Sequence, residues 1–141
     1  LTRIAEFLQQ GFCCSQILVL MGLEAQGKEN PDLVRAVHGL CGGIGSSGET
    51  CGTLTGAACL VGLYAGRGLP VEMPDGQLGP ILDELVDWFQ EQVGQQYGGI
   101  RCAEILAGDP ANQALRCPGI VVDTWQKTRE LLLARGYDLD G

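Results

Sequence analysis

Basic side chains are scarce in this sequence. Nine lysines and arginines stand against seventeen aspartates and glutamates, so the formal net charge is -8. Proteins that bind nucleic acids gather lysine and arginine against the phosphate backbone, so this balance excludes a nucleic-acid partner. The longest apolar run, residues 17–23, is far shorter than the roughly 20 residues that cross a bilayer, so we expect no membrane-spanning segment.

Strand-like alternation of apolar and polar residues is also lacking. Apolar residues recur instead at helical spacing, most clearly over residues 81–93, where one side carries Leu82, Leu85, Phe89 and Val93. Hydrophobic residues make up 45% of the chain, which suits one folded core. We therefore predict an all-α fold, a compact bundle of five to six helices forming a single domain over residues 1–141.

Glycine and proline residues mark the expected ends of the helices in this bundle. Helices are expected from residue 1, over 14–25, from Pro31 to a glycine-rich run at 39–48, over 51–65, over 81–93 and from about Pro118 to Gly136. Five glycines in ten residues predict that the 39–48 run is a loop before the buried central helix at 51–65. Residues 66–80 are expected to form a long surface connection.

Cys-x-x-Cys is absent, although the chain has seven cysteines. Its absence disfavours a thioredoxin-like motif and a zinc ribbon. An odd number would leave one thiol over in a fully paired secreted protein, so a reducing cytoplasm is the better expectation.

Four cysteines stand at or near expected helix starts. They are Cys14, Cys51, Cys102 and Cys117. The unpaired N–H groups and the dipole at a helix start stabilise a thiolate and lower its pKa, which favours nucleophilic or metal-ligating use. A bundle also brings such helix ends together. The remaining cysteines have weaker claims: Cys59 is expected to be a small buried hydrophobe, while Cys13 and Cys41 are the main competitors. His38, the only histidine, is interpreted as a capping or surface group rather than a ligand.

The glycine-rich run contains a G-x-G-x-x-G match at Gly43, Gly45 and Gly48. A dinucleotide site needs a preceding strand and an acidic residue about 20 positions later, and neither is predicted here. We expect these glycines to offer N–H groups beside Cys51 that bind a thiolate, a cluster sulfide or a small anion. The alternative is a connection that only closes a tight turn.

Several motifs together resemble one family, the redox-active C-GCAxxG-C-C proteins of anaerobic bacteria and archaea. They are residues 11–16 (Gly-Phe-Cys-Cys-Ser-Gln), 42–45 (Gly-Gly-Ile-Gly), 48–56 (Gly-Glu-Thr-Cys-Gly-Thr-Leu-Thr-Gly), 62–63 (Gly-Leu), Cys102 and Cys117. The resemblance covers roughly residues 8 to 120. It assigns the four family cysteines to Cys14, Cys51, Cys102 and Cys117, and it places Thr53 where the family favours alanine, a change expected to matter little.

Three functions fit these residues. The first is an electron-transfer or accessory protein that binds an iron–sulfur cluster through the four cysteines and docks its acidic surface on an oxidoreductase partner. The second is a thiol–disulfide redox protein that uses the same cysteines in reversible pairs, for instance Cys102 with Cys117. The third is a structural zinc site or a partner-binding module. A self-contained enzyme is less favoured than a redox protein, and homo-oligomerisation is left open.

Overall fold

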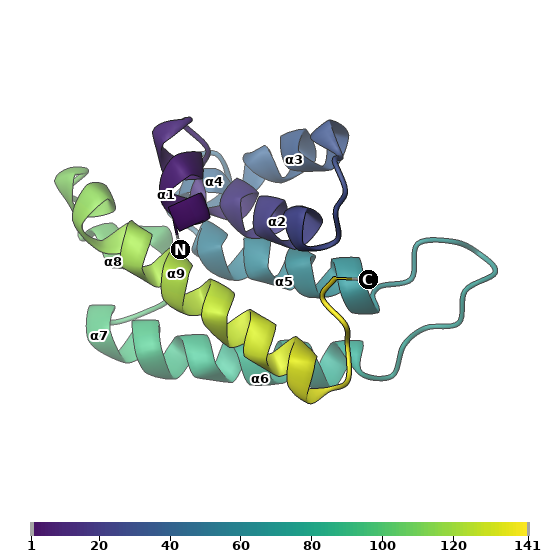
Figure 1. The fold of residues 1–141 in the computed structure, drawn as a ribbon. Helices are drawn as coiled ribbons and strands as arrows, with labels where there is room; N and C mark the ends of the chain where they lie inside the picture. The colour runs from purple at the N-terminus through teal and green to yellow at the C-terminus, as the bar shows by residue number, and fades with distance from the viewer. Residues whose placement is uncertain (1, 141) are drawn as a thin grey trace.

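The computed structural model describes residues 2–140, and it is built from helices (Figure 1). Over this range there is no β-strand, only an isolated bridge between Thr50 and Arg101. The all-α prediction is confirmed, and the count of longer helices is close to the expected five to six. These helices are α1 (Thr2–Gln9), α2 (Cys14–Ala25), α3 (Pro31–Val37), α5 (Gly52–Ala65), α6 (Leu78–Phe89) and α9 (Ala111–Ala134). Leu1, predicted to begin the first helix, lies outside the described residues.

Shorter turns join these helices. The glycine-rich run is a 3-10 turn, η1 (His38–Leu40), followed by the single turn α4 (Cys41–Ile44). Helix α6 begins three residues before the expected start at Ile81 and continues through the π-helical turn η2 (Gln90–Gly94) into α7 (Gln95–Tyr97). The last short element is α8 (Cys102–Leu106).

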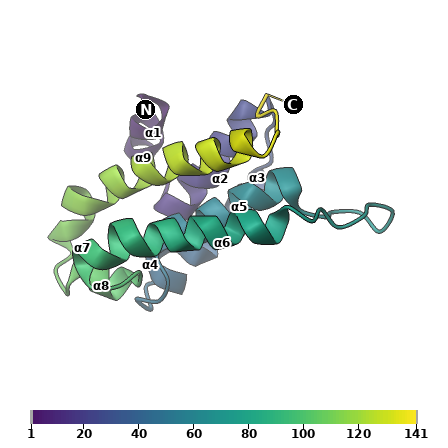
Figure 2. The same cartoon turned by 90° about the horizontal axis from the view of Figure 1, so that it is seen from below.

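Helix α5 is the centre of the bundle, as predicted for residues 51–65. It packs against α2, α6 and α9, and its Leu60 and Val61 are fully buried beside Ile17 of α2 and Leu85 of α6. Figure 2, seen from below, shows α6 and α9 running side by side across this core. Gly56 lets α5 approach α2 closely, because a Cβ there would lie 2.6 Å from the Cα of Ser15.

Helix α9 differs from the prediction at its start. It begins at Ala111, not near Pro118, so Pro118 lies inside the helix although it cannot donate a backbone hydrogen bond. Side-chain contacts support the extra turns: Asn112 Nδ2 donates to the Leu106 carbonyl at 2.8 Å, and Arg116 donates to the Ile105 carbonyl at 2.6 Å. Cys117 therefore sits within a helix rather than at its start.

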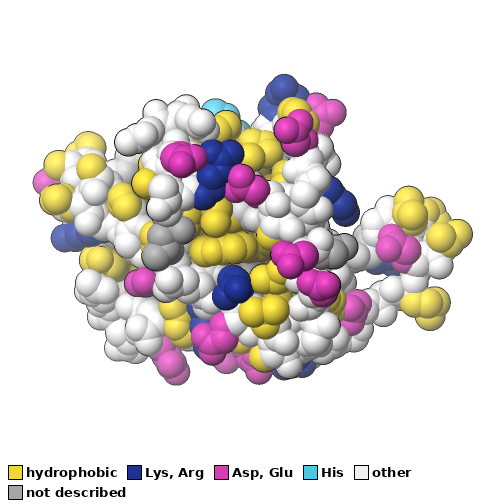
Figure 3. All heavy atoms as spheres, in the orientation of Figure 1, with side chains coloured by type: hydrophobic (Ala, Val, Ile, Leu, Met, Phe, Trp, Pro, Cys, Tyr) yellow, Lys and Arg dark blue, Asp and Glu magenta, His cyan; other side chains and the backbone are white. Residues whose placement is uncertain are grey.

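The connection after α5 projects from the bundle, as the right side of Figure 1 shows. It carries Leu69, Val71 and Met73, and the last two are 88% and 85% exposed. Figure 3 shows apolar side chains gathered on this projection. No helix in the described part of the chain is both long and apolar enough to cross a membrane.

Candidate functional site

Six of the seven cysteines line one cleft of about 650 Å³. They comprise the four predicted site residues, Cys14, Cys51, Cys102 and Cys117, together with Cys13 and Cys41. Cys59 lies elsewhere, partly buried against a smaller apolar cluster. The cleft thus collects side chains from the beginnings of α2, α4, α5 and α8 and from the second turn of α9.

A short backbone pairing brings Cys51 and Cys102 together. The Cys51 amide donates to the Ile100 carbonyl at 2.9 Å, and the Cys102 amide donates to the Glu49 carbonyl at 2.7 Å. This pairing holds the residue before α5 against the first residue of α8. Two cysteines that are 51 residues apart therefore reach the same cleft through main-chain contacts, which sequence patterns do not reveal.

The close crossing of α2 and α5 brings Cys14 to Cys51. Gly52, directly after Cys51, lies so near α2 that a Cβ there would be 2.9 Å from the Cys14 Sγ. The Cys14 and Cys51 side chains shift each other's pKa in opposite directions through a shared hydrogen bond, and the Thr53 side chain lowers the pKa of both. Thr53 is buried. The replacement of the family's usual alanine, expected to matter little, therefore adds a hydroxyl group at the thiol pair.

Cys51 is the cysteine that favours the thiolate. Its hydrogen bond from Cys14 is the largest cause, and the backbone N–H groups of Thr53 and Leu54 contribute, so that its pKa is lowered from 9.0 to about 6 despite burial. These amides belong to the first turn of α5. Cys51 therefore has the lowered pKa that is predicted for a thiol at a helix start.

The lowered pKa predicted for the other three cysteines is wrong, because the pKa of each is raised. The hydrogen bond to Cys51, followed by burial, raises the pKa of Cys14. Burial raises the pKa of Cys102, and it raises that of Cys117 to about 11, with smaller contributions from neighbouring thiolates. At Cys102, which does begin a helix, removal from water disfavours the charged form more strongly than the helix start stabilises it. At Cys117 the helix start itself is missing.

The glycine-rich loop forms one wall of the cleft. Of the three glycines proposed as N–H donors, Gly48 lines the cleft, whereas Gly43 and Gly45 are not among its lining residues. The Gly48 amide donates to the Gly42 carbonyl at 3.1 Å, and the Gly45 amide donates to the Cys41 carbonyl. These hydrogen bonds curl the loop on itself, and Gly43, with φ +69°, packs against the Glu49 backbone.

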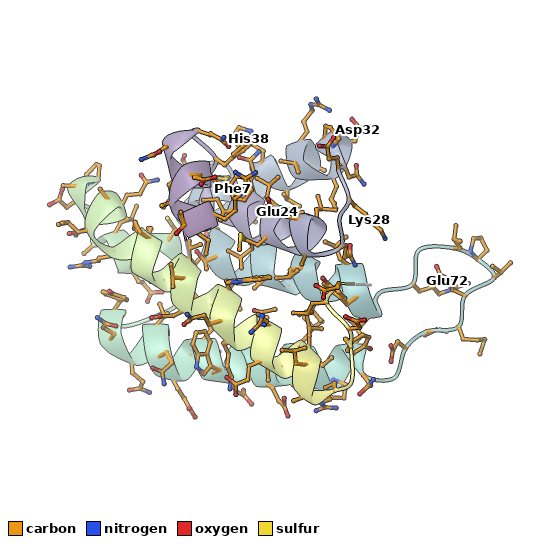
Figure 4. All side chains as sticks on the ribbon, viewed as in Figure 1. Phe7, Glu24, Lys28, Asp32, His38 and Glu72 are labelled. Atoms are coloured by element: carbon orange, nitrogen blue, oxygen red, sulfur yellow. A yellow bond between two sulfur atoms is a disulfide. The ribbon has the colours of Figure 1, made fainter. Side chains whose placement is uncertain are left out.

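Cys13 and Cys41 form a disulfide, with their Cα atoms 6.1 Å apart. The buried Ser15 hydroxyl lies 3.3 Å from one sulfur and 3.2 Å from the other, and it donates to the Val37 carbonyl at 2.8 Å. His38 is exposed beside this pair, and Figure 4 shows it near the end of α3 on the outside of the bundle. Sequence reasoning did not select this pairing. The short spacing of His38 and Cys41 indicates only that these two residues lie near each other, and it does not predict the disulfide.

The fold and the cleft define an all-helical protein built around clustered thiols. A family model described as "Putative redox-active protein (C_GCAxxG_C_C)" matches residues 12–131 of the 141-residue chain. The chain belongs to this family. Comparisons with curated proteins and with solved structures gave no match.

Proposed function

We propose that this chain is a redox protein that binds an iron–sulfur cluster through Cys14, Cys51, Cys102 and Cys117. The observation that carries the proposal is the convergence of these four free thiols on one cleft of about 650 Å³. Four thiolates are the usual ligand set for a [2Fe–2S] or [4Fe–4S] cluster, which supplies one-electron transfer when bound.

The arrangement of the four thiols supports a cluster over a single ion. A mononuclear zinc site holds its four sulfurs about 2.3 Å from one metal, which requires them to lie close together. Among the described residues, the group of potential ligands gathered within 4.8 Å of one another is a different one, Cys13, His38 and Cys41. Among the described residues, no three of the four family sulfurs gather that closely, so the set as a whole suits a group larger than one ion.

The chain's own residues would prepare this site for ligation. Cys51 already favours the thiolate, whereas Cys14, Cys102 and Cys117 have raised pKa values and must release protons on binding. The buried Ile105 and the partly buried Leu106 form apolar walls that limit the access of water. The net charge of -8 suits docking on a basic patch of an oxidoreductase.

Anaerobic reconstitution with iron and sulfide tests this proposal. The wild-type protein should become brown, with iron and sulfide in equal amounts, and serine at any of the four cysteines should lower the iron content. Cys59→Ser is the matched control, because Cys59 lies outside the cleft. A colourless, iron-free wild-type protein would overturn the proposal, as would equal iron loss in the Cys59→Ser control. Stoichiometric zinc in its place would favour the structural-site alternative.

The Cys13–Cys41 disulfide supports a second candidate, thiol–disulfide exchange. It shows that two cysteines of the cleft can reach bonding distance, while five cysteines remain free. In this function Cys102 and Cys117 would lose two electrons and two protons to a disulfide substrate, which would become two thiols. Alkylation followed by mass measurement should then show the reversible loss of these two free thiols. An unchanged count across oxidising and reducing conditions would exclude it.

A further inference from the structure

Cys13, His38 and Cys41 form a cluster outside the four family cysteines. Their two sulfurs and an imidazole nitrogen all lie within 4.8 Å of one another. The residues come from three neighbouring segments: Cys13 precedes α2, His38 begins η1, and Cys41 begins α4. The Cys41 amide donates to the His38 carbonyl, so the turn of η1 fixes the spacing of these two residues.

The Ser15 side chain contacts both sulfurs of this cluster. Its buried hydroxyl is within 3.3 Å of both sulfurs and is itself held by the Val37 carbonyl. Because this hydroxyl donates its one proton to the Val37 carbonyl, it can accept a hydrogen bond from a thiol, and it donates to a thiolate only if that proton turns from the carbonyl to the sulfur. Metal-ligating side chains commonly have such an outer-shell partner, which orients them. A disulfide makes no use of a neighbouring histidine, whereas a metal site can use its imidazole as a ligand.

We propose that reduction of the Cys13–Cys41 disulfide creates a metal site in which Cys13, Cys41 and His38 bind one Zn²⁺ or Fe²⁺ ion. Two thiolates and an imidazole suit these metals. An external dithiol would supply two electrons and two protons, opening the disulfide to two thiols and becoming a disulfide itself. Metal binding then releases the two thiol protons. The disulfide and the metal exclude each other, so metal occupancy follows the redox state.

The position of the cluster leaves room for a fourth ligand. Cys13 and Cys41 line the cysteine cleft, whereas His38 lines a neighbouring groove between α1, α2 and α3. His38 is exposed, and both cysteines are half-buried. Three protein ligands with an accessible fourth position are typical of reactive rather than structural zinc sites. This inference does not rest on the iron–sulfur proposal, because it uses none of the four family cysteines.

His38 provides the test, because it is the only histidine in the chain. Its imidazole resonances can be followed by NMR in the full chain while Zn²⁺ is added. After reduction with a phosphine, one equivalent of Zn²⁺ should shift these resonances, and the oxidised protein should show no such shift. His38→Ala should weaken Zn²⁺ binding, measured by competition with a chelating dye, by at least the roughly tenfold that loss of an outer-shell partner costs.

Cysteine variants separate this site from the four-cysteine set. Cys41→Ser should abolish the His38 shift, and Cys59→Ser should retain it. The double variant Cys102→Ser/Cys117→Ser should also retain it, although it would lose an iron–sulfur cluster. Unchanged His38 resonances in the reduced protein with Zn²⁺ would overturn the inference. Zinc binding that survives Cys41→Ser but is lost in the double variant would also overturn it, while leaving the four-cysteine site intact.

Discussion

Cys51 shows what decides the state of a thiol at the residue scale. Cys14, Cys51 and Cys102 all stand at helix starts, yet only Cys51 has a lowered pKa. It combines a donor side chain with two backbone N–H groups, and these outweigh a burial that by itself would raise its pKa. A helix start therefore gives a reactive thiolate here only because another thiol donates to it.

The first prediction concerns the reactivity of Cys51 in the reduced, metal-free protein. Its alkylation rate, followed by mass spectrometry of the labelled peptide, should rise with a midpoint near pH 6, well below 9.0. Cys14→Ala removes the main donor, so the midpoint should move upward. Cys14→Ser keeps a hydroxyl donor and should preserve much of the lowered pKa. Identical midpoints in the Ala and Ser variants would contradict the proposed hydrogen bond.

The same pKa shift predicts a pH dependence of stability. Because the pKa of Cys51 is lower in the folded than in the unfolded protein, its contribution is fully present above about pH 9 and is lost as the pH falls through about 6. The reduced wild-type protein should therefore gain free energy of unfolding relative to Cys51→Ser as the pH rises from 6 to 9. Urea unfolding at several pH values measures this difference, and a constant difference would contradict it.

The sequence predicts some site residues better than others. Cys14 and Cys51 are recognisable because an apolar helical stripe follows each of them directly. The Cys13–Cys41 pair is not, because Gly42 and Gly43 adopt positive φ values and turn the chain back. A local sequence pattern does not predict where a turn with positive φ values directs the residues on either side of it.

At the scale of elements, the crossing of α2 and α5 depends on Gly56. A Cβ there would lie 2.6 Å from the Ser15 Cα and 2.8 Å from its carbonyl oxygen, both of which are backbone atoms. Gly56→Ala should therefore lower the free energy of unfolding by about 1–3 kcal/mol. Gly62→Ala, in the same helix but with open space around it, should be neutral or stabilise by up to about 1 kcal/mol. Chemical denaturation compares the two, and equal effects would show that Gly56 has no packing role.

Helix ends were the least predictable elements. Asn30 and Pro31 mark the start of α3 correctly, because the Asn30 side chain accepts from the Leu33 amide at 3.1 Å. Pro118 gave the wrong start for α9, because Arg116 and Asn112 anchor the preceding turns to α8. Long-range contacts of this kind override a local proline signal.

The projecting connection after α5 is ordered by internal hydrogen bonds, which its amino-acid composition does not indicate. One oxygen of the Glu72 carboxylate accepts from the Gly68 amide at 2.8 Å and the Leu69 amide at 2.6 Å. Glu72→Ala should loosen the segment and speed cleavage by a protease specific for leucine or methionine by roughly fivefold. Glu72→Gln keeps an accepting oxygen and should be cleaved at a rate near that of the wild type. Equal cleavage rates in the wild-type and Ala proteins would show that these hydrogen bonds do not order the segment.

At the scale of the whole molecule, the fold places two kinds of cysteine chemistry around one cleft. The pairing of residues 48–51 with residues 100–103 assembles part of the four-cysteine set from distant segments. The disulfide joins residues 28 positions apart and ties the start of α2 to α4. The backbone pairing and the disulfide both constrain the part of the bundle that forms the cleft. Redox chemistry at the four-cysteine set or at the disulfide is therefore expected to affect the stability of the whole chain.

The last prediction measures that coupling. By the loop-entropy argument, a disulfide that closes a loop of this length contributes roughly 3–4 kcal/mol, so a phosphine reductant should lower the free energy of unfolding of the wild-type protein by about this amount. The variant Cys13→Ser/Cys41→Ser should be equally destabilised and insensitive to the reductant. An equal response of wild type and variant would show that the disulfide is not the source. If reduction creates a metal site, Zn²⁺ should then restore stability to the reduced wild type and not to Cys41→Ser, because a ligand that binds only the folded state stabilises it.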